Sequence, residues 1–213
     1  MKLQSIGTMV MGESGEAWIR EDRYPDPNDR RSLLGGADSP ILIEILIDAL
    51  KDKDPRVRSK AAWELGENGD ERAVDLMVEA LLDEDKSVRR CAAWGLGSKG
   101  DPRATSPLIQ ALEDESWRVR SAAAQALGEI GDPRAIDSLI KVLDDEDPTV
   151  RVGALWALGE IRDPKATDHL LRALDDESSR CRSVAADSRE KLGGINPGRI
   201  RRTASKFLGW MGR

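Results

Sequence analysis

The chain has 213 residues, of which 39% are hydrophobic and 34% are charged, and it contains a single Phe and a single Tyr. This composition favours many small interfaces between Ala and Leu side chains over one large aromatic core. The formal net charge of −6 argues against general nucleic-acid binding, because such binding needs a basic surface that displaces counterions from phosphates. We therefore expect no nucleic-acid partner.

Residues 1–38 precede the regular part of the chain. Residues 1–26 are expected to form a flexible lead-in, since Gly, Pro and charged residues are mixed in its second half. The apolar stretch from Ile6 to Met11 is short and is followed by acidic residues, which makes it a poor signal-peptide core. Residues 27–38 keep the register of the later chain, because Leu34-Gly35 lies 31 residues before Leu65-Gly66. We expect this segment to form an N-terminal cap helix with a polar outer side.

The next part of the chain, residues 39–194, repeats itself every 31 residues. Each unit is marked by a Val-Arg pair, a glycine and an aspartate. The pairs are Val57-Arg58, Val88-Arg89, Val119-Arg120 and Val150-Arg151, the glycines are Gly66, Gly97, Gly128 and Gly159, and the aspartates are Asp70, Asp101, Asp132 and Asp163. A fixed period of this length predicts stacked supersecondary units that contact only their neighbours.

Residues 132–161 show how one unit is built. Asp132-Pro133 supplies an N-cap and a proline at the first helical position, and apolar residues at helical spacing follow. Asp147-Pro148 supplies the same start for a second helix. Each unit is therefore predicted to hold two helices, named A and B, and the whole segment to hold five A/B pairs. The predicted caps of the B helices are Asp54, Asp85, Ser116, Asp147 and Ser178.

The last segment, residues 195–213, contains basic residues and no acid. The basic residues are Arg199, Arg201, Arg202, Lys206 and Arg213. Apolar residues recur between them at helical spacing, which predicts a basic amphipathic helix. We expect this helix to cap the last repeat, and weak contact with a membrane or an acidic partner is the alternative.

The repeat pattern resembles a known family. The segment from Val119 to Gly131, followed by Asp132-Pro133-Arg134-Ala135, is similar to the HEAT-like repeats of the phycobilisome-lyase type. The resemblance implies an all-α fold: a right-handed α-solenoid of about five two-helix HEAT-like repeats with N- and C-terminal capping helices. It also implies that the B helices line the concave side. The resemblance is specific for the fold and says little about function.

A row of large side chains is predicted on the face of the B helices opposite their core stripe. At 100° per residue, Trp63 falls on this face, and the equivalent positions in later repeats are Trp94, Gln125 and Trp156. The charged residues of the same stripe are Lys60, Arg90, Glu129 and Glu160. Solvent-facing tryptophans in a row indicate a partner-binding surface. In the alternative interpretation, the rings lie flat across neighbouring B helices and only shield small alanines.

The arginines of the Val-Arg pairs have two interpretations, an anion-binding groove or a structural ladder between repeats. Their predicted place is the edge of the core, near turn carboxylates, which favours the ladder of charge-assisted hydrogen bonds. The ladder arginines are Arg58, Arg89, Arg120, Arg151 and Arg182, and the carboxylates are Asp52, Asp83, Asp114, Asp145 and Asp176.

Residues suited to catalysis or metal binding are scarce. His169 is the only histidine, which leaves little material for a His-based metal site, a general base or a nucleophilic triad. We therefore predict no catalytic residue, no metal and no cofactor. Deoxyhypusine hydroxylase is similar in repeat class and holds iron with His-Glu pairs on its inner helices. The corresponding positions read Ser59-Lys60, Arg90-Cys91, Ser121-Ala122, Val152-Gly153 and Ser183-Val184, so the iron ligands are absent.

The two cysteines, Cys91 and Cys181, lie three repeats apart. At roughly 10 Å per helix layer they are too distant for a disulfide, so reduced thiols and a cytoplasmic location are expected. Cys91 is the only suggestive nucleophile of the B-helix stripe, and an inert buried thiol is the alternative.

The predicted function is that of a noncatalytic protein–protein interaction scaffold, a monomer that binds a protein or peptide partner in its concave groove. The alternative is a bilin lyase or isomerase-like accessory factor, which the resemblance alone implies. Such relatives attach or detach a tetrapyrrole on the cysteines of phycobiliproteins. A deoxyhypusine hydroxylase-like oxidoreductase is the third hypothesis, and the missing His-Glu pairs argue against it.

Overall fold

The computed structural model describes residues 40–67 and 71–193, all of which belong to one compact unit. The predicted lead-in of residues 1–26, the N-terminal cap helix of residues 27–38 and the C-terminal cap helix of residues 195–213 lie outside these described residues. No helix in the described part is long and apolar enough to cross a membrane.

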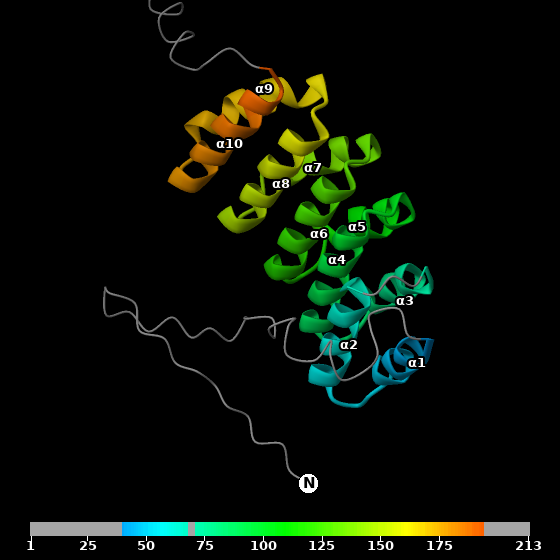
Figure 1. Cartoon of the computed structure of the whole chain (residues 1–213). Coiled ribbons are helices and arrows are strands. Elements are labelled where there is room, and N and C mark those ends of the chain that lie inside the picture. Colours follow the sequence, from blue (N-terminus) through cyan, green and yellow to red (C-terminus); the bar gives the residue numbers. More distant parts are fainter. Residues whose placement is uncertain (1–39, 68–70, 194–213) are drawn as a thin grey trace, which may run out of the picture. The chain divides into compact units, whose positions relative to one another are not determined.

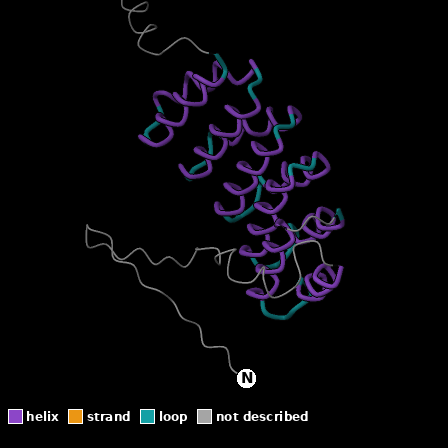
Figure 2. Tube along the Cα trace, viewed as in Figure 1, coloured by secondary structure: helices purple, strands orange, loops and turns teal. Residues whose placement is uncertain are grey.

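The described residues form helices joined by short loops, arranged in two layers (Figures 1 and 2). The A layer holds α1 (Pro40–Ala49), α3 (Arg72–Ala80), α5 (Thr105–Ala111), α7 (Ile136–Val142) and α9 (Thr167–Arg172). The B layer holds α2 (Pro55–Glu67), α4 (Lys86–Lys99), α6 (Trp117–Ile130), α8 (Pro148–Ile161) and α10 (Ser179–Lys191). Each B helix packs on the next B helix and on the A helix of its own pair. The predicted α-solenoid with five A/B pairs is confirmed.

Short 3₁₀ turns complete several of the A helices. They are η1 (Pro102–Ala104), η2 (Pro133–Ala135), η3 (Pro164–Ala166) and η4 (Ala173–Asp175). The first three follow an aspartate cap, so the A helix predicted to start at Asp132-Pro133 begins with a tight 3₁₀ turn before α7. The aspartate side chain still satisfies a backbone donor, because Asp132 accepts a hydrogen bond from the N–H of Arg134 at 2.9 Å.

Most predicted B-helix caps act through their side chains. Asp85 accepts from the N–H of Ser87 at 2.7 Å, and Asp147 accepts from the N–H of Thr149 at 2.7 Å. Ser116 is the N-cap residue of α6 as predicted, but its hydroxyl makes no capping hydrogen bond. The backbone N–H of Ser116 donates to the carboxylate of Asp114 at 2.8 Å, a turn contact that the other B-helix caps also make.

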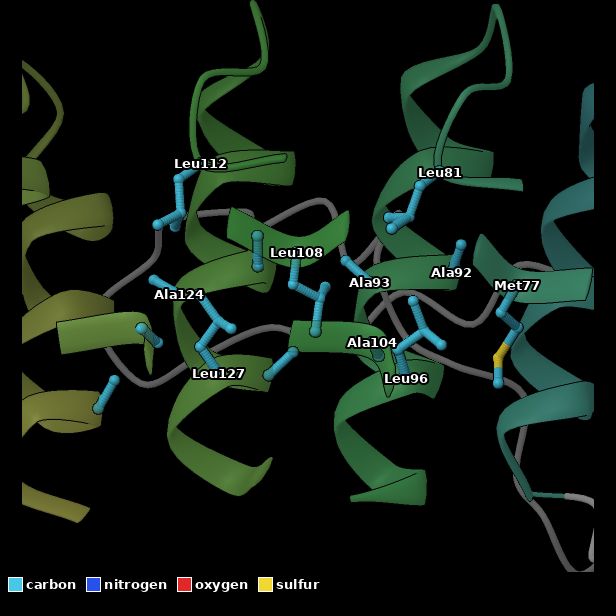
Figure 3. Packing of buried hydrophobic residues seen from close by; sticks show 14 of the residues in the cluster. Met77, Leu81, Ala92, Ala93, Leu96, Ala104, Leu108, Leu112, Ala124 and Leu127 are labelled. Carbon is cyan, nitrogen blue, oxygen red and sulfur yellow. The ribbon is translucent and has the colours of Figure 1, made fainter. Parts of the chain in front are cut away.

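The hydrophobic core lies between the two layers. Leucines of the B helices, such as Leu96 and Leu127, point toward A-layer residues such as Leu108, and all three are fully buried (Figure 3). Small residues set the spacing within the B layer. A Cβ on Gly128 would lie 2.8 Å from the Cα of Ala157 on the next B helix, closer than real Cβ atoms approach. Glycine at this register therefore permits the close stacking of α6 on α8.

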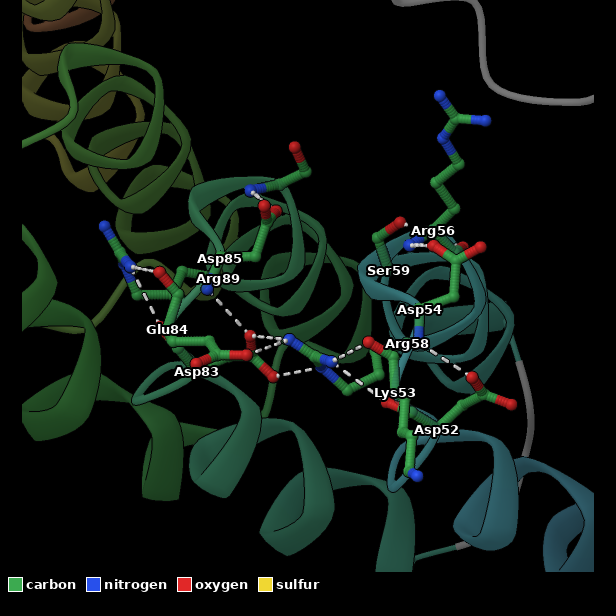
Figure 4. A network of polar contacts seen from close by, with 11 residues as sticks. Asp52, Lys53, Asp54, Arg56, Arg58, Ser59, Asp83, Glu84, Asp85 and Arg89 are labelled. Carbon is green, nitrogen blue, oxygen red and sulfur yellow. Dashed lines mark hydrogen bonds and ion pairs between the residues drawn. The ribbon is translucent and has the colours of Figure 1, made fainter.

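An arginine ladder joins consecutive repeats at the A–B turns (Figure 4). Arg58 donates from Nε and Nη2 to the carboxylate of Asp83 in the next repeat, both at 2.8 Å. Its Nη1 donates to the backbone oxygen of Asp52 in its own turn at 2.9 Å. The same arrangement recurs in the pairs Arg89–Asp114, Arg120–Asp145 and Arg151–Asp176. Each guanidinium thus links two turns with bidentate geometry.

The charge state of the ladder carboxylates follows from these contacts. Burial raises the pKa of Asp145, but hydrogen bonds from Arg120 and from the backbone N–H of Asp147, together with the positive charges of Arg120 and Arg151, outweigh burial. The pKa of Asp145 therefore lies below the ordinary value for aspartate. The carboxylate stays ionised and paired at neutral pH.

Arg182 differs from the other arginines of the ladder. It donates to the backbone oxygens of Asp176 at 2.8 Å and Glu177 at 2.9 Å, as the others do in their own turns. Among the described residues, no carboxylate of a following repeat accepts from it. In the described part of the chain, Arg182 therefore makes only the own-turn contacts of a ladder arginine.

A buried arginine marks the last described B helix. Arg189 is 5% exposed, and its Nε and Nη1 have no hydrogen-bond partner in the described part of the chain. The equivalent position holds a fully buried leucine in the four preceding B helices, Leu65, Leu96, Leu127 and Leu158. An unpaired guanidinium in an apolar layer is unfavourable, because it loses hydration without compensation.

Arg189→Leu is therefore expected to raise the free energy of unfolding by about 1–3 kcal/mol. Urea denaturation followed by far-UV circular dichroism measures the change. Arg180→Leu, at an exposed position of the same helix, is the control and should change stability by less than ~0.5 kcal/mol. Equal effects of the two substitutions would show that the burial of Arg189 is not the cause.

Candidate functional site

The candidate site is the B-layer surface, defined as the face of α2, α4, α6 and α8 turned away from the A helices. The structure corrects one member of the predicted solvent-facing row. Trp63 is only 6% exposed and belongs to the core, so it does not offer its ring to solvent. The helical wheel predicted the correct face of α2 for Trp63. A wheel describes one helix alone, so it could not predict that α4 covers this face.

Trp63 is buried because α2 and α4 lie very close together. A Cβ on Gly66 would lie 2.6 Å from the Cα of Gly95, so the two backbones touch at these glycines. At this spacing the Trp63 ring stacks on the Trp94 ring, with 5.7 Å between centroids and 13° between planes. Such an offset pair stabilises the contact between the two repeats. The packing interpretation therefore describes Trp63.

Trp94 and Trp156 are half-buried and keep part of each ring on the B-layer surface. The Trp156 ring also leans on the preceding helix, since its Cζ3 would lie 2.7 Å from a Cβ on Gly128. Both indoles are consequently held by packing and are partly exposed. Rigid amphipathic rings of this kind are suited to contact a partner.

Between them, α6 carries polar residues in the same row. Gln125 is exposed and donates from Nε2 to the hydroxyl of Ser121 at 3.4 Å. Glu129, one turn further along α6, is exposed, and its Oε2 lies against the backbone of α4, where it would collide with a Cβ on Gly97. Partial desolvation raises the pKa of Glu129 above the ordinary glutamate value.

The remaining predicted charged residues differ in their surroundings. Lys60 is exposed, whereas Arg90 is half-buried. Glu160 forms an ion pair with Lys191 of α10, so its charge is balanced within the chain. The stripe thus combines two half-exposed tryptophans, an exposed lysine and an exposed glutamate on a rigid layer of helices.

One cation–π pair, Trp117 with Arg118, was not predicted from the sequence. Trp117, in the first turn of α6, is half-buried, and the guanidinium of Arg118 lies 4.5 Å from the centroid of its ring. This cation–π contact lies beside the acidic turn before α6. The sequence could have indicated this contact, because the equivalent position of the other B helices holds a proline or a polar residue.

Chemically reactive groups are few in the described part. Both cysteines are buried thiols outside any disulfide, and Cys91 is therefore packed inside the B layer. No group of three or more His, Cys, Asp or Glu residues in residues 40–67 and 71–193 is arranged to hold a metal ion. The distinctive chemistry of the surface is aromatic and ionic.

Paired helices in two layers, an arginine ladder between repeats and an aromatic stripe on one layer define an α-solenoid repeat protein. Comparison with known families gives the same class in more detail. HEAT repeats match residues 32–90, 77–146 and 105–188, and the chain belongs to this family.

Among solved structures, the chain is similar to the complex of CpcE and CpcF of phycocyanin lyase from Nostoc sp. PCC7120. The identity is 33% and the TM-score is 0.65, over 70% of this chain and 64% of that chain. The chain thus spans somewhat less than two thirds of the length of this relative. The predicted resemblance to HEAT-like repeats of the phycobilisome-lyase type is confirmed.

More distant structures share the fold alone. A designed armadillo repeat protein is 20% identical with a TM-score of 0.56, over 70% of this chain and 81% of that chain. Human deoxyhypusine hydroxylase is 22% identical with a TM-score of 0.50, over 71% of this chain and 73% of that chain. A search of curated proteins finds no match.

Proposed function

We propose that the protein is a noncatalytic scaffold that binds a protein or peptide partner on its B-layer surface, the concave side of the solenoid. The observation that carries the proposal is the pair of half-exposed tryptophans, Trp94 and Trp156, held by packing on a regular repeat framework. Binding energy in protein interfaces concentrates in such anchors, because a rigid indole buries a large area and loses little conformational entropy.

Charged groups support the same proposal. Lys60 and Glu129 are exposed on the stripe and can select a partner of complementary charge. The arginine ladder is already occupied by turn carboxylates, so these arginines serve the framework and leave recognition to the stripe. We propose a monomer in the cytoplasm as the working form, consistent with two buried reduced cysteines.

Replacing both surface tryptophans is expected to remove partner binding. In affinity capture from lysate of the source organism, Trp94→Ala with Trp156→Ala should lose proteins that the wild type retains, and a purified client should bind at least ten-fold more weakly. Trp63 stays unchanged, since its removal would create a core cavity.

The control is Trp117→Ala, which removes a half-buried tryptophan at the turn edge of α6 instead of the stripe. Circular dichroism must first show equal helicity for all variants. Capture of the same clients by the wild type and the double variant would contradict the scaffold proposal, because the two rings would then serve packing only.

A second candidate is a bilin lyase-like accessory role. The favouring observation is the 33% identity to a phycocyanin lyase complex. The test is absorption and fluorescence titration of the protein with free phycocyanobilin, and with the bilin-free phycobiliprotein subunit as acceptor. A spectral shift with transfer to the acceptor would favour this candidate over the scaffold. An unchanged bilin spectrum at high protein concentration would eliminate it.

A further inference from the structure

The row of tryptophans on the B-layer surface is interrupted at α6, which has no tryptophan at the row position. Trp156 of α8 leans its ring onto Gly128 of the preceding helix. The equivalent slot, over Gly97 of α4, would belong to a tryptophan at position 125, but that position holds Gln125. Oε2 of Glu129 fills the slot instead and lies against the backbone of Gly97. A carboxylate therefore occupies the place of an indole in an otherwise aromatic row.

This carboxylate has no counter-charge. Within residues 40–67 and 71–193, the Glu129 carboxylate forms no ion pair and accepts no hydrogen bond, whereas Glu160 of the next repeat pairs with Lys191. Its contact with α4 removes part of its hydration, and this raises its pKa. Partial desolvation without compensation is unfavourable for the charged form, and a bound cation would relieve it.

Both B helices that pack on α6 carry a tryptophan of the row. Trp94 lies one turn before Gly97 on α4, so both face the same side of that helix. Trp156 lies against Gly128, the neighbour of Glu129 in the sequence. Glu129 thus comes from α6, the helix between the two that carry Trp94 and Trp156, and each indole can contact a flat, weakly hydrated cation.

We propose that Glu129 binds an arginine side chain of the partner, with Trp94 and Trp156 as flanking aromatic contacts. The inference rests on the proposed scaffold function and gives it a partner chemistry: a segment that presents a guanidinium. Arginine fits better than lysine, because its planar fork donates two parallel hydrogen bonds to a carboxylate and its faces stack on indoles. An ammonium group is more strongly hydrated and gains less from this partly desolvated position.

The test uses a tetra-arginine and a tetra-lysine peptide, both with blocked ends, titrated into the full-length protein in physiological salt. Tryptophan fluorescence and isothermal calorimetry report binding. We expect tetra-arginine to bind at least several-fold more tightly than tetra-lysine, and Glu129→Gln to weaken tetra-arginine binding about ten-fold. The glutamine is isosteric, so the thermal unfolding curve should not change.

The matched control is Glu146→Gln, which removes the same charge from a turn glutamate whose side chain is 91% exposed. It should weaken binding less than two-fold, because general attraction to the acidic surface is screened by salt. Equal weakening by the two variants, equal affinity of the two peptides, or no binding of tetra-arginine would overturn the inference.

The outcome is separable from that of the scaffold proposal. If the double tryptophan variant loses its client while Glu129→Gln retains full affinity for it, the scaffold stands and the arginine site fails. If Glu129→Gln loses the client as well, and the client has an arginine whose replacement by lysine has the same effect, the arginine site is supported.

Discussion

Arg120→Ala is expected to lower the free energy of unfolding by about 3 kcal/mol. The guanidinium of Arg120 bridges the turn before α6 and the carboxylate of Asp145, with side-chain exposures of 12% and 10%. Its removal leaves Asp145 partly buried without its bidentate partner, and breaking a buried ion pair in this way costs about 3–5 kcal/mol. Urea denaturation followed by circular dichroism measures the loss.

The molecule contains a matched control for this substitution. Arg182→Ala removes the same side chain from the equivalent position of α10, where it donates to the backbone of its own turn and to no described carboxylate. Its expected effect is below ~1 kcal/mol, as for other exposed polar contacts. A similar loss for Arg120→Ala and Arg182→Ala would show that the carboxylate half of the ladder contributes little.

The ladder substitution should act locally before it acts globally. Repeats of a solenoid contact only their neighbours, so the stability of the stack is close to a sum of unit and interface terms. Hydrogen exchange of Arg120→Ala should therefore increase first in α6 and α8, the helices on either side of the broken rung.

Leu127→Ala is the second substitution with a large expected effect, a loss of about 2–5 kcal/mol. Leu127 is fully buried on α6 and faces the A layer, so its truncation leaves a cavity that the rigid helix stack fills poorly (Figure 3). Thermal or urea unfolding of the purified variant gives the magnitude.

Leu82→Ala is the counterpart on the surface. Leu82 follows α3 and is 83% exposed, so its truncation removes hardly any buried area and should change stability by less than ~0.5 kcal/mol. A large loss from Leu82→Ala would mean that this side chain is covered in solution, which would point to an additional contact at the A–B turn.

The sequence alone predicted the framework of the site well, because the framework depends on local signals. These signals are Asp-Pro caps, glycines at a fixed register and apolar stripes at helical spacing, and each is a property of a single repeat. Because they recur in several repeats, one irregular repeat does not change the prediction. Ser116 is an exception within this regular pattern, since it occupies the N-cap position of α6 but its hydroxyl makes no capping hydrogen bond.

The chemistry of the surface was less predictable. The wheel placed Trp63 and Trp94 on one face with equal exposure, but exposure depends on how closely the next helix packs. Contact of Gly66 with Gly95 brings the two rings into a stack that buries Trp63 and leaves Trp94 partly exposed. A helical wheel describes one helix, so it contains no information on the distance between α2 and α4.

The sequence by itself determined the period, the two helices per repeat, the family and the residues that join the repeats, because each of these follows from spacing along one chain. Only the tertiary structure decided which side chains of a common face stay accessible and which charges find a partner. Arg182 has the sequence context of a ladder arginine but donates to no carboxylate among the described residues, and Glu129 has an α4 backbone contact that no repeat pattern encodes. The physical reason is that burial and pairing depend on distances between neighbouring repeats, which the close stacking of the B helices sets.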